Sequence, residues 1–482
     1  MELYLNNVGI IKESNVLLDG LTVITGKNSS GKTTVGKVMY SLLSAGSDLV
    51  EAFEESKRVY LCSQLDKVEE TLKIRRFINA HAREGYGQNT PEGLLYFVAM
   101  RGYRRYDVEN LTLLLIAMRD LIKELTLESY QEYLLSKNIK NVYRGESFIS
   151  SLQENFSIWH AKSLEICEMT LELIEDENAL YNFLKDRTNA VLNHEFNGQI
   201  RPIKYPNYVS KIELRNNSEC IVKAKVKTEK NVSYAQESSF IYPFERCIFI
   251  DNPFVIDKLD NLDDLYRPAF RTVAERNSKT MITSKSIKDH DEILKQLLIS
   301  GEQKNYFDEL ELQNKYRAVF ERINDIVPGE FAKTSDGYFY VQKGVPLSVR
   351  NLATGSKMFF IVKKLLLNGL IDHNTMLILD EPESHLHPEW INKFAEILVL
   401  LVKNVKVNVL LTTHSPNLML ALNVYARKMD LNDEAHFYLA EQGEDRYFSN
   451  IRCIDESIGE GYSHLSIPLV EMNLELEELN GE

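Results

Sequence analysis

The spacing of hydrophobic residues changes twice along the chain. Near the N-terminus, short apolar runs of strand type cover residues 2–5, 16–18 and 21–24, and a glycine-rich turn then leads into a helical stretch over 33–43. From 48 to about 195 apolar residues recur at spacings of three and four, which is typical of helices with one buried face. Beyond about 208 the spacing becomes two, and strands alternate with helices through 455. The pattern predicts an α/β fold with a helical insertion.

The prediction that the insertion is helical rests on two apolar stripes. They consist of Val108, Leu111, Leu115, Met118, Ile122 and Leu125, and of Leu164, Cys167, Leu171 and Ile174. Such stripes are more often the core of a bundle than a binding surface. They are also too short for a long coiled coil, which needs many uninterrupted heptads.

Composition narrows the class of protein. The 482 residues are 44% hydrophobic and 26% charged, as in folded proteins, and 56 Lys plus Arg against 70 Asp plus Glu give a net charge of −14. A chain this acidic is not a general nucleic-acid coat, because that affinity comes from cations that neutralise phosphates. No secretion signal and no apolar run of about 18 residues is found, so we expect no membrane span. Five scattered cysteines without a C-x-x-C pair predict reduced thiols in a cytoplasmic protein.

A phosphate-binding loop is the strongest motif. Residues 26–33 fit the pattern G-x-x-x-x-G-K-[ST], between an apolar run and a predicted helix. The glycines let backbone N–H groups point at phosphate oxygens, Lys32 would reach the β- and γ-phosphates, and Thr33 would bind Mg²⁺. We assign ATP binding to Gly26, Lys27, Asn28, Ser29, Ser30, Gly31, Lys32, Thr33 and Thr34.

Two further apolar runs are followed by candidate catalytic or Mg²⁺-binding side chains. Residues 376–379 lead into Asp380 and Glu381, at the strand end where ligands of open α/β sheets bind. Asp380 suits the Mg²⁺ shell, and Glu381 suits a general base that deprotonates the attacking water. Residues 409–411 lead to His414, which could hydrogen-bond the γ-phosphate or that water.

A fourth motif, Leu352-Ala353-Thr354-Gly355-Ser356-Lys357, opens a helical run over 358–370. The free N–H groups of a helix N-terminus attract anions. The order of the four motifs resembles the ABC-type P-loop ATPase head, and the run Asp380–Pro388, DEPESHLHP, resembles the OLD, RecF and SMC-like branch. The resemblance implies a split head with a mixed sheet, and a dimer in which Thr354, Gly355 and Ser356 act on ATP held by the other subunit.

One position departs from this family. Ala353 stands where the family usually carries a serine whose hydroxyl meets the γ-phosphate. The lost charge-assisted hydrogen bond is worth about 1.5–3 kcal/mol, so slow turnover with ATP acting as a switch is one expectation. The other expectation is that the hydroxyl of Thr354 substitutes for that of the missing serine.

The resemblance and the changes of spacing together suggest four parts. The ATPase head covers 1–47 and 196–465, the helical insertion covers 48–195, and an acidic amphipathic tail covers 466–482. In the tail, Leu469, Met472, Leu476 and Leu479 recur at helical spacing among five glutamates. This helix could dock on a partner or pack on its own subunit, and the sequence does not distinguish the two.

The absence of a nuclease motif shapes the functional prediction. Only 68 residues follow His414 (482 − 414), without the D-x-D motif of the TOPRIM nuclease of OLD proteins. An OLD-like head of this kind looks most like the PtuA-type ATPase subunits of Septu anti-phage systems, which implies a separate HNH nuclease partner and indirect or weak contact with DNA. The alternatives are a RecF-like ATPase that binds DNA in repair, and an ATPase-gated RNA-cleaving toxin.

Three minor patterns have competing explanations. The cluster Arg101, Tyr103, Arg104, Arg105 and Tyr106 is nucleic-acid-like, yet a solvated or partner-facing cluster is the more frequent case. Lys223, Lys225 and Lys227 alternate with Val222, Ala224 and Val226, as on a strand with one solvated face, although a phosphate contact is also open. His385 and His387 could be a metal pair, but we favour a role at the dimer interface.

Overall fold

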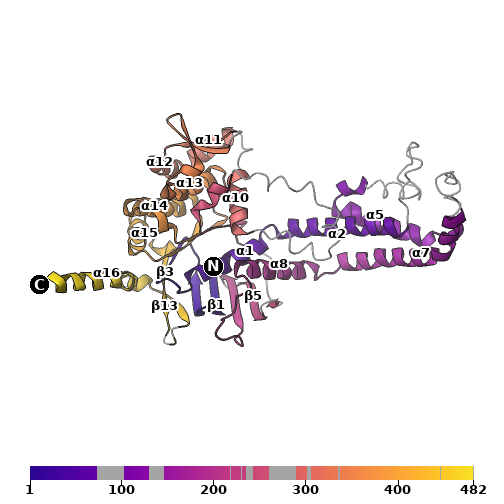
Figure 1. Ribbon diagram of the computed structural model, residues 1–482, viewed down its shortest axis with the longest axis horizontal. Coiled ribbons are helices and arrows are strands. Elements are labelled where there is room, and N and C mark those ends of the chain that lie inside the picture. Colours follow the sequence, from indigo (N-terminus) through magenta and orange to yellow (C-terminus); the bar gives the residue numbers. More distant parts are fainter. Residues whose placement is uncertain are drawn as a thin grey trace. The chain divides into compact units, whose positions relative to one another are not determined.

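The computed structural model describes residues 1–72, 102–129, 146–217, 219–228, 231–234, 243–259, 289–300, 306–334, 337–443, 445 and 447–480. Contacts divide the chain into two compact units. The head consists of Met1–Ser47 and Lys185–Glu482, and the insertion consists of Asp48–Leu184 (Figure 1).

An eleven-stranded mixed sheet forms the centre of the head, in the order β6-β5-β4-β1-β2-β14-β13-β3-β12-β11-β7. Its strands β7, β11, β12, β3 and β13 run parallel, and β6, β5, β4, β1 and β2 form an antiparallel part. The strands are β1 Glu2–Val8, β2 Ile11–Leu17, β3 Leu21–Gly26, β4 Ser210–Asn216, β5 Glu219–Thr228, β6 Asn231–Tyr234, β7 Arg246–Ile250, β11 Thr375–Asp380, β12 Asn408–Thr413, β13 Ala435–Gln442 and β14 Ser449–Cys453. Because β1–β3 precede the insertion and the others follow it, the predicted split α/β fold with a mixed sheet is confirmed.

Helices cover both faces of the parallel part. One apolar core packs residues of α13–α15 against the sheet, and a second packs α1 and the antiparallel strands. The central strands β3, β11 and β12 are therefore buried along almost their whole length, which explains their continuous apolar runs. The helices of the head are α1 Lys32–Gly46, α10 His290–Ser300, α11 Tyr306–Lys315, α12 Arg317–Ile326, α13 Thr354–Leu367, α14 Pro388–Leu400, α15 Pro416–Lys428 and α16 Ile458–Asn480.

A smaller sheet and several short helical turns also belong to the head. The sheet has the order β10-β9-β8, with β8 Glu330–Thr334, β9 Gly337–Gln342 and β10 Val345–Ser348. Strands β8 and β9 pair antiparallel. The short turns η3 Pro253–Lys258 and η8 Pro382–His385 follow β7 and β11.

The insertion is helical, as predicted. Its described elements are α2 Leu49–Thr71, η1 Gly102–Arg105, α5 Val108–Glu124, α7 Glu146–Ile174 and the start of α8 Ala179–Glu195. One core unites α2, α5 and α7, and it contains the stripe residues Leu111, Leu115, Met118, Ile122, Cys167 and Leu171. The stripes are thus bundle core.

The arginine and tyrosine cluster of the insertion is partly engaged in packing. Tyr103 is buried, and both its hydroxyl and the Arg104 guanidinium contact the carboxylate of Asp66, at 2.5 and 2.8 Å. Arg105 is exposed, and Arg101 lies outside the described residues. The cluster therefore offers fewer free cations than its sequence implies.

Helix α8 belongs to both units. The contacts separate the units between Leu184 and Lys185, within this helix, whereas the sequence pattern placed the limit at 195. The reason is that Val191 and Leu192 of α8 are buried in the head core. Helical periodicity cannot detect such a change of packing partner inside one helix.

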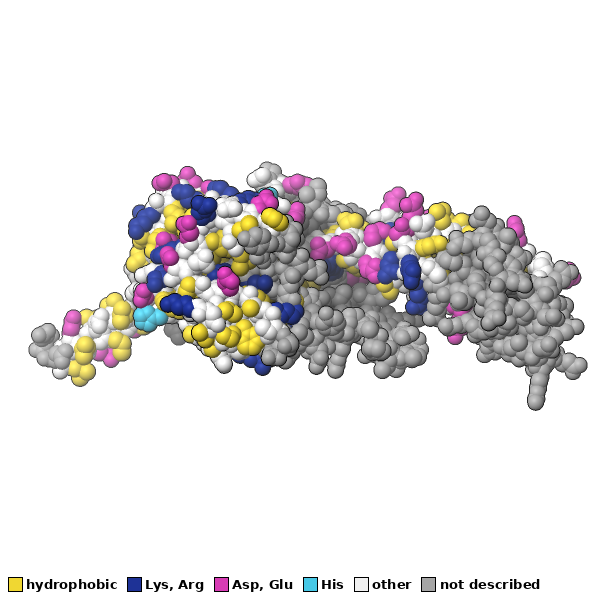
Figure 2. Space-filling model, turned by 90° about the horizontal axis from the view of Figure 1, so that it is seen from above, with side chains coloured by type: hydrophobic (Ala, Val, Ile, Leu, Met, Phe, Trp, Pro, Cys, Tyr) yellow, Lys and Arg dark blue, Asp and Glu magenta, His cyan; other side chains and the backbone are white. Residues whose placement is uncertain are grey.

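The C-terminal helix α16 packs on the head only in its first part. The Asn423 amide donates a hydrogen bond to the Tyr462 hydroxyl at 2.9 Å, and Gly461 lies against Met419. Further along, Leu469, Met472, Leu476 and Leu479 are exposed. Figure 2 shows hydrophobic and acidic side chains together on the surface of this helix. None of the described helices combines the length and apolar character that crossing a bilayer requires.

Candidate active site

The loop between β3 and α1 has the backbone of a phosphate cradle. Gly26 and Gly31 have φ values of 155° and 90°, in the region that favours glycine. A Cβ on Gly26 would lie 2.5 Å from the carbonyl oxygen of Ala440, so this position accepts no side chain. Ser30 places a buried hydroxyl without a hydrogen-bond partner in the same loop. An unsatisfied donor at a helix N-terminus fits an anionic phosphate.

Lys32 is held inside this loop. Its ammonium is 3% exposed, donates hydrogen bonds to the carbonyls of Gly26 and Lys27 at 3.0 and 2.9 Å, and lies 3.4 Å from Glu381 Oε1. The loop carbonyls keep the charge at the centre of the cradle. The cation therefore lies inside the loop, and its contact with phosphate oxygens stays a prediction.

Thr33 and Asp380 meet although 346 residues separate them in the chain (380 − 33 − 1). The Thr33 hydroxyl lies 2.9 Å from Asp380 Oδ2, and Thr412 donates its hydroxyl to Oδ1. Burial raises the pKa of Asp380, and the negative charges of Glu381 and Asp251 add to this, whereas the two threonine hydroxyls lower it. Such a desolvated carboxylate beside a hydroxyl suits a hard cation such as Mg²⁺.

Glu381 and His414 form the next pair. Glu381 Oε2 lies 3.2 Å from His414 Nδ1, and the two side chains are 30% and 41% exposed. Glu381 has φ 47°, and its N–H donates to the carbonyl of Thr412 at 3.1 Å. This turn presents the carboxylate between Lys32 and His414, with access for water. The geometry fits a general base.

Two acidic residues of the site had no assigned role in the sequence. Glu383 is buried, accepts the Thr413 hydroxyl and the His414 N–H, and so fixes the loop that carries His414. Burial raises its pKa. Asp251 follows β7, whose Ile250 pairs with Leu379, so it ends the strand next to that of Asp380. The sequence did contain a signal that could have indicated Asp251 as a site residue, because this acid directly follows an apolar strand.

The fourth motif lies apart from these residues. Within the described chain, no hydrogen bond or ion pair joins Thr354, Gly355 or Ser356 to the P-loop, and the Cβ position of Gly355 faces His385, Leu386 and Trp390. The Lys357 ammonium donates a hydrogen bond to Asp257 Oδ1 at 2.6 Å. One chain therefore brings together Lys32, Thr33, Asp380, Glu381 and His414, but not the residues at the start of α13.

His385 and His387 have other contacts than a shared metal. The His387 ring accepts the Glu389 N–H at 3.3 Å at the start of α14. The His385 ring packs edge-on against Phe254, with centroids 5.5 Å apart. Among the described residues, neither histidine belongs to a group of three or more possible metal ligands.

A P-loop on β3, an acidic pair at the end of β11 and a histidine after β12 define a P-loop ATPase. A family model described as "AAA ATPase domain" matches residues 1–419, and the chain belongs to this family. Proteins of this family generally use ATP and Mg²⁺. A search of curated proteins finds no matching relative.

Several solved structures are similar to this chain at low identity. The SMC head domain from Thermotoga maritima is 11% identical, with 94% of this chain and 97% of that chain covered and a TM-score of 0.32. An SMC head domain with a coiled coil and joint from Pyrococcus yayanosii is 10% identical, with 97% and 99% covered and a TM-score of 0.32. The SMC head bound to the C-terminal domain of ScpA from Pyrococcus furiosus is 9% identical, with 99% and 98% covered and a TM-score of 0.30. TM-scores this low add no argument about function.

Proposed function

We propose that this ATPase is the ATP-binding and ATP-hydrolysing subunit of a cytoplasmic anti-phage defence complex, that it forms head-to-head dimers, and that it regulates a separate HNH-type nuclease. The proposal of a dimer rests on the observation that one chain does not bring all the predicted ATP-site residues together. Lys32, Thr33, Asp380, Glu381 and His414 meet within one chain, whereas among the described residues no hydrogen bond or ion pair joins Thr354–Ser356 to them. Two copies would each complete the other's site.

The residues of the loop have defined tasks in this proposal. Gly26–Thr34 hold the phosphates, and Thr33 with Asp380 hold Mg²⁺. Bound ATP supplies the γ-phosphoryl group that is hydrolysed. Glu381 takes the proton of the attacking water, and His414 orients the Glu381 carboxylate from 3.2 Å. Lys32 stabilises the negative charge that develops on the phosphate oxygens.

ATP acts as a switch if the dimer binds it more tightly than the separated heads do. A shift from 1:99 to 99:1 needs a difference of about 5.5 kcal/mol in binding free energy. Ala353 has no hydroxyl and caps α13 without a side-chain hydrogen bond. This feature supports slow turnover and a long-lived ATP-bound dimer.

The nuclease partner is supported by the resemblance alone. Residues 435–442 and 449–453 form β13 and β14 of the central sheet, so these parts of the chain after His414 belong to the ATPase head. The exposed apolar half of α16 offers a surface on which another subunit could bind.

The proposal is tested with the purified full-length chain and with an HNH protein encoded next to it. We expect Glu381→Gln to form dimers when ATP is added, and Lys32→Ala to remain monomeric. We expect cleavage of nucleic acid only when the HNH protein is present. RNA cleavage by this chain alone would favour the toxin alternative, and the absence of any ATP-dependent change in mass would contradict the shared site.

A second function, direct DNA binding in repair, is favoured by one cluster on the head. The rings of Tyr205, Tyr208 and Phe448 stack on one another, and Lys12 lies 4.8 Å from the Phe448 centroid. Lysines combined with aromatic faces are typical of single-stranded nucleic-acid sites. DNA-stimulated ATP hydrolysis that falls steeply with salt, and that Lys12→Ala weakens, would support this alternative.

A further inference from the structure

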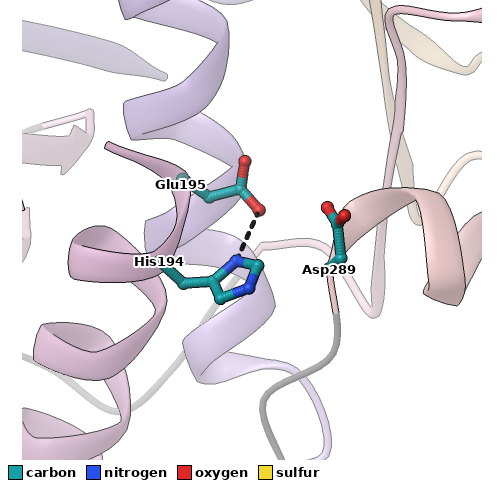
Figure 3. Close-up of side chains that lie close together, drawn as sticks. All are labelled: His194, Glu195 and Asp289. Atoms are coloured by element: carbon teal, nitrogen blue, oxygen red, sulfur yellow. Dashed lines mark ion pairs between the residues drawn. The ribbon is translucent and has the colours of Figure 1, made fainter. Parts of the chain in front are cut away.

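A cluster of possible metal ligands lies outside the ATP site. His194 and Glu195 are the last two residues of α8, and Asp289 directly precedes α10. Figure 3 shows the three side chains directed toward a common space. His194 Nδ1 lies 3.9 Å from Glu195 Oε1, and one ligand atom from each residue lies within 4.8 Å of the others. All three belong to the head.

Glu195 gives an independent sign of a missing ligand. Its side chain is 2% exposed, and Oε1 is buried without a hydrogen-bond partner. The other oxygen, Oε2, lies 3.0 Å from His290 Nδ1. An unpaired carboxylate oxygen is costly to bury, and in folded proteins such groups are paired or bind a metal. The unpaired oxygen is the one that faces His194.

The local charge also favours a cation. His290 lies between three carboxylates, those of Glu195, Asp251 and Asp289, at 3.0, 3.1 and 3.1 Å. The Lys37 ammonium contacts the backbone carbonyl of Glu195 at 3.1 Å. Three carboxylates therefore converge on one small region of the head, and this arrangement favours a cation.

We propose that His194 Nδ1, Glu195 Oε1 and a carboxylate oxygen of Asp289 bind one divalent transition-metal ion of the Zn²⁺ or Mn²⁺ class. One imidazole nitrogen with two carboxylates suits these ions, whereas the all-oxygen pair Thr33 and Asp380 suits Mg²⁺. His290 holds Glu195 through its second oxygen, as outer partners of metal ligands do. His194 and Asp289 are half-exposed, which leaves an entry path and room for water ligands.

The consequence for the head is a cross-link between two segments that are distant in sequence. The ion joins the end of α8 to the start of α10, and α10 also carries His290. Through His290 the cluster reaches Asp251, which ends the strand beside Asp380. This inference does not depend on the proposed defence function.

The test uses the full-length, metal-stripped protein without nucleotide. We expect calorimetric titration to show one equivalent of Zn²⁺ or Mn²⁺ per chain, with much weaker binding of Mg²⁺ and Ca²⁺. His194→Ala and Asp289→Asn should each weaken the binding about tenfold or more, since loss even of an outer partner costs about 10–100-fold. His373→Ala is the matched control, because this exposed histidine lies in the turn between α13 and β11.

A second measurement guards against misfolded variants. The metal should raise the thermal unfolding temperature of the wild type in a concentration-dependent way, because it binds only the folded state. This increase should vanish in His194→Ala and Asp289→Asn and persist in Asp380→Asn, which alters the ATP site. No bound equivalent in the wild type, or equal affinity in the wild type and both ligand variants, would overturn the proposal. So would an equal loss in His373→Ala.

Discussion

Replacing Glu381 by glutamine separates ATP binding from hydrolysis. The substitution keeps the size of the side chain but removes the carboxylate that lies 3.4 Å from Lys32 Nζ and 3.2 Å from His414 Nδ1. Loss of a general base slows the chemical step about 10²–10⁴-fold. At about 1.36 kcal/mol per tenfold, the barrier rises by about 3–5 kcal/mol.

The effect on ATP binding should be small. Glu381 is 30% exposed, and an ion pair of this kind contributes about 0–1 kcal/mol. The variant also loses a negative charge near the site of the γ-phosphate. We therefore expect ATP affinity to stay equal or to increase by at most about fivefold, which corresponds to about 1 kcal/mol.

Single-turnover hydrolysis measures the chemical step, and a fluorescent ATP analogue measures binding. The matched control is Glu389→Gln, because Glu389 is an exposed glutamate paired with Lys393 on the neighbouring helix α14. The control should hydrolyse ATP at the wild-type rate. A Glu381→Gln variant that hydrolyses ATP within about threefold of the wild type would refute the assignment of Glu381 as the base.

Three further changes test other parts of the structure. Lys32→Ala should abolish ATP binding in the same binding assay, because its buried ammonium is the cation at the centre of the loop, and retained affinity would contradict this role. Ala353→Ser should speed steady-state hydrolysis about 10–150-fold, since one charge-assisted hydrogen bond is worth about 1.5–3 kcal/mol, and an unchanged rate would exclude position 353 as the cause of slow turnover. Burial lowers the pKa of Lys363, so the unfolded chain binds more protons between that lowered value and pH 10.5, and wild-type stability rises with pH over this interval. Denaturant unfolding should therefore show a larger loss of stability for Lys363→Met at pH 10 than at pH 7, and an equal loss would contradict the lowered pKa.

The principal motifs were accessible from the sequence because each is local. The P-loop needs two glycines at a fixed spacing between a strand and a helix, and Asp380 with Glu381 directly follows an apolar run. Glu383 could not be assigned in this way, because its role depends on Thr413 and His414 of the next strand. Asp251 lacked an assignment because nothing in the sequence says that β7 is the neighbour of β11.

The sequence by itself determined the ATPase class, the split by a helical insertion and the loop for which phosphate binding is predicted, because these follow from local motifs and spacing. The tertiary structure decided what depends on distant neighbours. It placed Thr33 against Asp380, ended the insertion inside α8, and brought His194 and Glu195 to Asp289. The physical reason is that the order of strands in a sheet, and the burial of one helix end against another segment, depend on packing between residues hundreds of positions apart.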